Sequence, residues 1–177
     1  HFGVGCDQIL LIEPPKNPNV DFYYRIFNAD GSEVAQCGNG ARCIALFAKQ
    51  KGLTTKDIII FQTHERIIEC HLLKNNHVKV NMGKPNQNPQ KIPFLAQKQQ
   101  TTYTIVADGR KLRICPLSVG NPHCVVWLKE LASLNIEKIG RLLSQHPRFP
   151  QKTNVDFVQI MDKNTIRLRV FERGVGE

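Results

Sequence analysis

A short internal repeat limits the possible folds of this chain more than any other pattern in it. Residues 25–27 read RIF and residues 169–171 read RVF, and a glutamate, Glu33 or Glu177, follows each phenylalanine at the same distance. Each copy lies at the end of a pair of strand-like apolar runs that a turn-rich break separates. The first pair is QILLIE and DFYYRIF, separated by PPKNPN, and the second is DFVQIM and IRLRVF, separated by DKNT. Duplication predicts two halves of similar architecture, although so short a match also arises by chance.

Apolar periodicity predicts the remaining elements. Residues 41–50 form a helix that stops at Gly52, and because apolar side chains lie on nearly every side, we expect protein to surround it. Residues 136–143 have amphipathic helical spacing, and that helix ends before Pro147. Short apolar runs predict further strands at residues 58–61, 67–73, 78–82, 103–109, 112–120 and 123–128.

The stretch GKPNQNPQKIP, residues 83–93, is rich in proline and asparagine and has the composition of a connection between domains. We therefore expect one half at residues 1–83 and the other at residues 84–177. Short strands with a single helix in each half indicate an α+β protein with largely antiparallel sheets.

Composition narrows the class of protein. The 177 residues are 41% hydrophobic and 22% charged, which is ordinary for a globular chain, and no apolar run nears the roughly 18 residues of a membrane span. Six cysteines without CxxC or metal-like spacing favour a reducing compartment, so we expect a soluble, cytoplasmic protein without a metal site. The net charge of +9 comes from scattered basic residues, which favours a solvated surface or an anionic small molecule over nucleic acid or a membrane.

The segment QCGNGAR, residues 36–42, places Cys37 at the start of the first predicted helix. A thiolate there is stabilised by the helix dipole and by free backbone N–H groups, so Cys37 is a candidate base or nucleophile. Gly38 and Gly40 let the backbone approach a ligand carboxylate or phosphate, and Asn39 adds side-chain hydrogen bonds. The alternative is a packed structural cysteine, and that description suits the cysteines in apolar or strand-like surroundings: Cys6, Cys43, Cys70, Cys115 and Cys124.

Other polar residues lie at the ends of strand-like runs in both halves. They are Asn28, Asn121, His123, Asn154, Glu172 and Arg173. Each alone is typical of a turn, but together they would line a cleft between two similar domains. The set suits an ionised, multiply charged amino acid. Two thiols on opposite sides of one substrate carbon would invert that carbon by general acid and base catalysis.

These motifs resemble a known family. RIFNADGSEVAQCGNGARC, with GVGCDQ before it and SVGNPHCVV, TNVDFVQI and RVFERGVGE after it, closely resembles bacterial diaminopimelate epimerase over essentially the whole chain. The resemblance implies two similar domains, each a mixed, mostly antiparallel sheet curled around a central helix. It also implies conversion of LL-2,6-diaminopimelate to the meso isomer for lysine and peptidoglycan synthesis, without cofactor or metal, in an enzyme that is usually a homodimer.

The resemblance assigns roles residue by residue. It makes Cys37 one of two acid/base thiols, and it makes His123 and Glu172 the pair that assists proton transfer, each serving either thiol. It places Arg173 on the distal carboxylate as a bidentate fork. The remaining substrate contacts that it implies are Gln8, Asn28, Gly38, Asn39, Asn121 and Asn154, with Gly38 and Asn39 at the α-carboxylate.

The ends depart from the family pattern. The family's first strand would precede His1, and its second cysteine, in a T-x-x-C-G-S-G loop, would follow Glu177, where the internal repeat also places a cysteine. We therefore expect a fragment that is inactive alone. The rivals are a proline or hydroxyproline racemase, a phenazine-biosynthesis isomerase that lacks the cysteine, and a basic nucleic-acid-binding module. The last would lose affinity steeply with salt and would tolerate Cys37→Ala.

Overall fold

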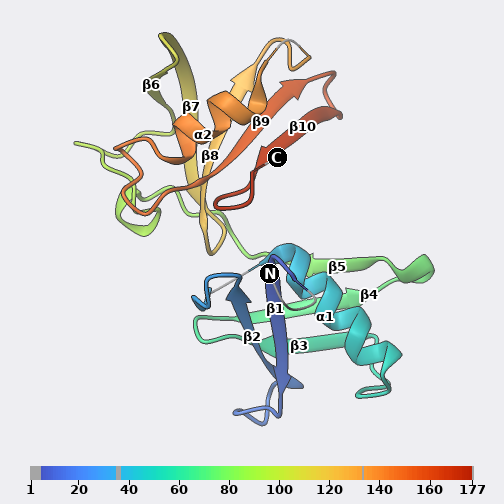
Figure 1. Cartoon of the computed structure of the whole chain (residues 1–177). Helices are drawn as coiled ribbons and strands as arrows, with labels where there is room; N and C mark the ends of the chain where they lie inside the picture. The colour runs from blue at the N-terminus through green and yellow to red at the C-terminus, as the bar shows by residue number, and fades with distance from the viewer. Residues whose placement is uncertain (1–4, 35–36, 133, 177) are drawn as a thin grey trace. The chain divides into compact units, whose positions relative to one another are not determined.

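The computed structural model describes residues 5–34, 37–132 and 134–176 (Figure 1). The chain divides into two compact units, residues 1–83 and residues 84–177. In the described residues, each unit contains one five-stranded sheet and one longer helix.

The first unit has strands in the order β1-β2-β3-β4-β5. Their bounds are β1 Gln8–Glu13, β2 Phe22–Asn28, β3 Ile58–Gln62, β4 Ile67–Leu72 and β5 Val78–Asn81, with α1 at Gly38–Gln50 and a 3-10 turn at Lys74–Asn76. Neighbouring strands are antiparallel except for the parallel pair β2 and β3. The helix α1 lies across the sheet (Figure 1). Its buried residues Ala41, Ile44 and Ala45 belong to one hydrophobic core with Tyr24 and Phe61.

The second unit has strands in the order β10-β9-β8-β7-β6. Their bounds are β6 Tyr103–Ala107, β7 Arg110–Ser118, β8 Pro122–Leu128, β9 Asn154–Ile160 and β10 Ile166–Phe171, with α2 at Ile136–Ser144 and a 3-10 turn at Pro89–Lys91. Here the parallel pair is β8 and β9, and the other pairs are antiparallel. The apolar face of α2, with Ile139 and Leu143, belongs to one core with Phe157 and Phe171.

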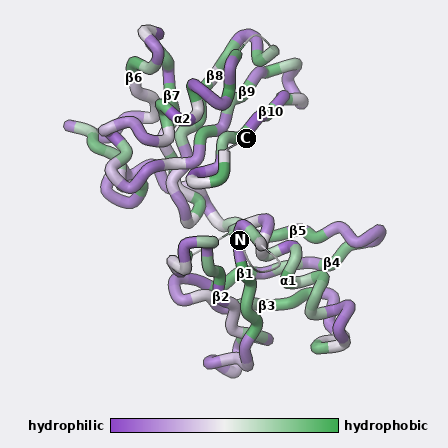
Figure 2. Tube along the Cα trace, viewed as in Figure 1, coloured by the Kyte–Doolittle hydropathy of each residue, from purple (hydrophilic) through white to green (hydrophobic). Residues whose placement is uncertain are grey.

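The α+β class with two mixed, mostly antiparallel sheets is confirmed. Both predicted hairpins, the other predicted strands and the helix that ends before Pro147 are present. Hydrophobic residues concentrate on α1 and β3, while the turn between β4 and β5 is hydrophilic (Figure 2).

The expectation that protein surrounds α1 on every side is wrong for the described residues. Cys43 is exposed and Phe47 is 44% exposed. The reason is geometric, because one sheet covers one face of a helix, and the buried positions Ala41, Ala45 and Ala48 fall on that face. The helix also begins three residues before the predicted start, at Gly38, because Cys37 supplies its N-cap.

The two repeat-bearing hairpins share their register. Phe27 pairs with Ile9 and Phe171 pairs with Val155, so in both hairpins the phenylalanine faces the second residue of the first strand. The shared register supports duplication. The hairpins join their sheets differently, because β2 pairs with β3 whereas β9 pairs with β8. Glu177, which completes the second copy of the pattern, lies outside the described residues.

Candidate functional site

The first group of predicted site residues begins at the N-terminus of α1. Cys37 has extended backbone, with φ −142° and ψ 114°, and its Sγ accepts a hydrogen bond from the backbone N–H of Gly40 at 3.3 Å. The thiol is half-buried against the core of the first unit. Donation from a helix N-terminus stabilises negative charge on the sulfur. The structure therefore places the Cys37 sulfur at the N-terminus of α1, within reach of a backbone N–H group.

The glycines around Cys37 have a packing role in addition to the one expected from the sequence. A Cβ at Gly40 would lie 2.4 Å from Tyr24 Oη and 3.1 Å from Leu10 Cδ2, so the space beside Gly40 is filled by protein and not left for a ligand. A Cβ at Gly38 would lie 3.3 Å from Met82 Cε. The backbone of Gly38 and the exposed side chain of Asn39 remain at the first turn, where Asn39 Oδ1 accepts a hydrogen bond from the Arg42 guanidinium.

The hydroxyl of Tyr24 lies beneath this turn. Tyr24 is 1% exposed, and its Oη has no hydrogen-bond partner among the described residues. Burial raises the pKa of Tyr24 far above its usual value of 10.0, and the nearby thiols of Cys37, Cys70 and Cys43 raise that pKa further. Tyr24 therefore stays protonated, and it presents a donor close to the cysteine cap.

We expect Tyr24→Phe to leave the free energy of unfolding unchanged or to raise it by about 1 kcal/mol, because removing an unpaired buried hydroxyl removes a desolvation cost. Hydrogen exchange of the α1 amides would measure the change in the first unit. Tyr103→Phe is the matched control. The hydroxyl of Tyr103 accepts from Gln100 N at 2.8 Å and donates to Lys98 O at 3.1 Å, so its loss should destabilise the second unit. A loss of more than about 1 kcal/mol in Tyr24→Phe would show that the hydroxyl has a partner.

Gln8 and Asn28 lie together at one end of the first hairpin. Gln8 begins β1, Asn28 ends β2, and the two residues pair across the strands. Gln8 Nε2 donates to Asn28 Oδ1 at 3.1 Å, and Asn28 Nδ2 donates to Ser32 Oγ at 3.1 Å. The antiparallel register thus brings together two amides that are twenty residues apart in sequence.

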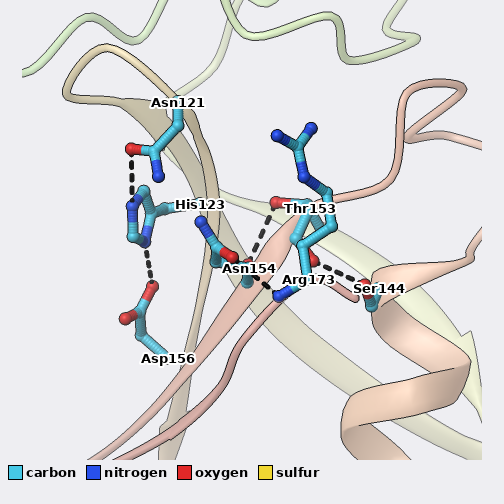
Figure 3. Close-up of polar contacts among 7 residues, drawn as sticks. All are labelled: Asn121, His123, Ser144, Thr153, Asn154, Asp156 and Arg173. Carbon is cyan, nitrogen blue, oxygen red and sulfur yellow. Dashed lines mark hydrogen bonds and ion pairs between the residues drawn. The ribbon is translucent and has the colours of Figure 1, made fainter. Parts of the chain in front are cut away.

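The second unit holds a line of three polar side chains (Figure 3). His123, near the start of β8, lies with Nε2 3.0 Å from Asn121 Oδ1 and with Nδ1 2.8 Å from Asp156 Oδ2. His123 and Asp156 are mostly buried, with side chains 19% and 15% exposed. Asn121 and His123 were expected at the site, whereas Asp156 was not.

Asn154, Glu172 and Arg173 meet at the same end of the sheet. Asn154 begins β9, in register with His123, and its Oδ1 accepts from the backbone N–H of Arg173 at 2.8 Å. Glu172 directly follows β10 and opens a tight turn, with Glu172 N donating to Gly176 O at 2.7 Å. Strands β8 and β9 are parallel and start at the same end of the sheet, and antiparallel β10 finishes at that end. The residues at these strand ends therefore lie close together.

Further hydrogen bonds, one of them from α2, stabilise this end of the sheet. Ser144 Oγ, at the end of α2, donates to Thr153 O at 2.6 Å, and Thr153 Oγ1 donates to Asn154 O at 3.0 Å (Figure 3). Arg173 Nη1 donates to Gln151 O at 3.1 Å. The contacts to Thr153 O and Asn154 O are buried, and they hold the backbone on both sides of Asn154.

The predicted site residues thus form two groups, one in each unit. The first contains Gln8, Asn28, Cys37, Gly38 and Asn39, and the second contains Asn121, His123, Asn154, Glu172 and Arg173. The sequence did not indicate Tyr24 or Asp156 as site residues. A signal for Asp156 was present, because it is a lone charge inside the apolar run NVDFV.

The other cysteines divide into two kinds. Cys70, Cys115 and Cys124 are buried, as expected of structural thiols, but Cys6 and Cys43 are exposed, contrary to expectation. Burial raises the pKa of Cys70 to about 11. Burial also raises the pKa of Cys124, and the Asp156 carboxylate adds to that shift. Cys70 and Cys124 are therefore protonated at neutral pH and poorly suited to act as bases.

Within the described ranges, no group of three or more histidine, cysteine, aspartate or glutamate side chains is arranged to hold a metal ion. In the same ranges, no helix has the length and apolar character needed to cross a membrane.

The chain is similar to known proteins in sequence and in fold. The sequence profile of the diaminopimelate epimerase family matches residues 1–87 and 115–177. Over all 177 residues the chain is 49% identical to a diaminopimelate epimerase of Ectopseudomonas mendocina and 46% identical to one of Teredinibacter turnerae. The chain spans 64% of the length of each of these relatives.

Solved structures share the fold at much lower identity. A hydroxyproline epimerase from Agrobacterium vitis has a TM-score of 0.67 at 16% identity, over 96% of this chain and 54% of that one. A Bacillus anthracis phenazine biosynthesis protein has a TM-score of 0.61 at 16% identity, over 96% of this chain and 58% of that one. These likenesses show the fold, and the sequence matches give the family. The chain belongs to the diaminopimelate epimerase family.

Proposed function

We propose that this chain supplies one acid/base thiol and part of the substrate site of an enzyme that interconverts LL- and meso-2,6-diaminopimelate. The observation that carries the proposal is the placement of Cys37 as the cap of α1, where the Gly40 N–H donates to its sulfur, in a chain 49% identical to a diaminopimelate epimerase. Two units with similar hairpins suit the two halves of such an enzyme, at residues 1–83 and 84–177.

The reaction that we propose is an inversion by two thiols. The Cys37 thiolate takes the α-proton from one face of the substrate, and a thiol on the other face gives a proton to the resulting carbanion. In the reverse direction the two thiols exchange roles. Because the buried Cys70 and Cys124 are poor bases, and because the repeat predicts a second cysteine after Glu177, we assign the second thiol to a residue outside these 177. The 177 residues alone should then not epimerise the substrate.

The substrate contacts follow from the two groups of residues. The N–H groups at Gly38 and Asn39, at the start of α1, suit the α-carboxylate. Arg173 suits the distal carboxylate, and the Asn154 amide holds the Arg173 backbone in place. The ammonium and carboxylate groups of the substrate make further hydrogen bonds with the side-chain amides of Gln8, Asn28, Asn121 and Asn154.

His123 and Glu172 are assigned to proton transfer at the thiols. His123 lies near the start of β8 and Glu172 directly follows β10, at the end of the sheet where β9 begins with Asn154. A histidine changes charge near neutral pH more readily than any other side chain, which suits the exchange of a proton with a thiol. The chemistry needs no cofactor. We further infer a cytoplasmic homodimer that acts in lysine and peptidoglycan precursor synthesis and binds no nucleic acid.

A substrate panel tests the proposed function. A version of the protein extended to the length of its relatives would be incubated with LL-diaminopimelate, L-proline and trans-4-hydroxy-L-proline, and chiral chromatography would identify the isomers formed. We expect only diaminopimelate to be epimerised. Conversion of proline or hydroxyproline instead would keep the two-thiol fold and overturn the substrate.

A further inference from the structure

We propose that Asp156 is a positioning residue for His123. Its carboxylate holds the protonated Nδ1 of the imidazole, so that Nε2 is the ring atom that takes up and releases a proton. This inference rests on the proposed function for its catalytic consequence. Its structural part, which says that Nδ1 of the His123 ring carries the proton, depends only on the geometry of the second unit.

The sheet places the two side chains together. On the parallel strands β8 and β9, His123 is in register with Asn154, and Val125 is in register with Asp156. Side chains two residues apart on a strand point to the same face, so Asp156 lies one step along from His123 on that face. The resulting distance between Asp156 Oδ2 and His123 Nδ1 is 2.8 Å (Figure 3).

The chemistry of the pair fixes the proton. An ionised carboxylate only accepts hydrogen bonds, so Nδ1 must carry the hydrogen that joins the two groups. Neutral His123 then has its lone pair on Nε2, and charged His123 has an N–H there. Asp156 therefore leaves one ring nitrogen, Nε2, for proton exchange.

Asn121 can serve both charge states of that nitrogen. In the structure its Oδ1 lies 3.0 Å from Nε2, where it accepts from the charged ring. After a half-turn of the amide, its Nδ2 would donate to the lone pair of the neutral ring. Asp156 is thus the fixed partner of His123 and Asn121 is the adjustable one.

The setting of Asp156 argues for a role beyond general stability. Its side chain is 15% exposed, and its cross-strand partners on β8 and β10, which share its face of the sheet, are Val125 and Val170. An unpaired carboxylate in such surroundings is costly, and a hydrophobic residue would suit the strand better. The carboxylate is instead paired to a histidine whose other nitrogen meets an amide at the strand end.

Nitrogen-15 NMR of the imidazole ring tests the structural part on the 177-residue chain. At a pH where the ring is neutral, we expect His123 to show a protonated Nδ1 and a bare Nε2, with His123→Gln identifying the signals. Because this measurement uses the wild-type chain, it does not depend on whether a variant of Asp156 folds. A bare Nδ1 in the wild-type ring would overturn the proposal.

Asp156→Asn tests the cause. An amide can donate to Nδ1 as well as accept from it, so the variant should lose the preference for the Nδ1-protonated form. Asp162→Asn, the same change at an exposed carboxylate in the turn between β9 and β10, should leave the His123 signals unchanged. If His123 in Asp156→Asn kept the same preference for a protonated Nδ1 as in the wild type, the proposal would be overturned.

Kinetics test the catalytic consequence in the extended protein. Asp156→Asn should lower kcat for diaminopimelate at least about tenfold while KM changes little, because the variant disturbs proton transfer and not substrate contacts. Normal kcat would overturn the positioning role. If the extended wild-type protein does not act on diaminopimelate, the proposed function fails, and the NMR result still decides whether Asp156 sets the state of His123.

Discussion

Cys37→Ala in the extended protein should abolish epimerisation of diaminopimelate, with kcat lowered by at least about a thousandfold. General acid and base catalysis contributes roughly 10²- to 10⁴-fold, and the variant removes the base for one face of the substrate completely. The fold should survive, because Cys37 is only half-buried and its cap contact is a single hydrogen bond from Gly40 N. Conversion of LL- to meso-diaminopimelate, followed by chiral chromatography, measures the loss.

Cys43→Ala is the matched control for that variant. Cys43 lies on the same helix, is exposed, and follows Cys37 by six residues. We expect Cys43→Ala to keep kcat within about twofold, since the side chain lies outside the first turn, where the helix dipole acts. Equal activity in Cys37→Ala and Cys43→Ala would remove Cys37 from the mechanism.

Gly140→Ala should destabilise the second unit by about 2 kcal/mol, although the same change in an open helix position stabilises by about 1 kcal/mol. A Cβ at Gly140 would lie 2.5 Å from Phe171 Cγ and 2.6 Å from Phe171 Cβ, in the core between α2 and β10. Urea unfolding followed by fluorescence of Trp127 measures the effect, because Trp127 is the single tryptophan of the chain and lies on β8.

The contact between Gly140 and Phe171 also affects the predicted site residues. Phe171 directly precedes Glu172, so any shift of the ring also moves the predicted site residues at the end of β10. Gly140→Ala and Phe171→Ala should be non-additive, with the double variant destabilised by less than the sum of the two single changes, because alanine at 171 removes Cγ and the ring from the place of the new methyl group. A stabilising effect of Gly140→Ala alone would mean that α2 and β10 pack less closely than described.

Much of the fold could be predicted because local patterns decide it. The alternating runs on both sides of PPKNPN and DKNT specify hairpins, and the spacing of Ile136, Ile139 and Leu143 specifies one buried face of α2. The exposed face of α1 was missed. Composition shows that a helix is apolar, but it does not show how many sides are covered by neighbouring elements.

The site was predictable only in part. Cys37, His123 and the strand-end amides stand out by residue type, and the antiparallel register then explains why Gln8 and Asn28 meet. Asp156 and Tyr24 lie at the site through contacts with residues that are distant in sequence. His123 and Asp156 are thirty-three residues apart, and the contact between Tyr24 and the turn at Gly40 depends on how α1 packs on β2. Such contacts arise from tertiary packing, which residue types alone do not reveal.

The most direct test of the account is exchange of the α-proton of LL-diaminopimelate in D₂O, followed by proton NMR. The 177-residue chain and the extended protein would be compared with the Cys37→Ala variant of the latter. We predict that the extended protein incorporates deuterium and forms the meso isomer, and that the chain alone and the variant form no meso isomer. Formation of the meso isomer at an undiminished rate by the Cys37→Ala variant would contradict the assignment of Cys37 as an acid/base thiol.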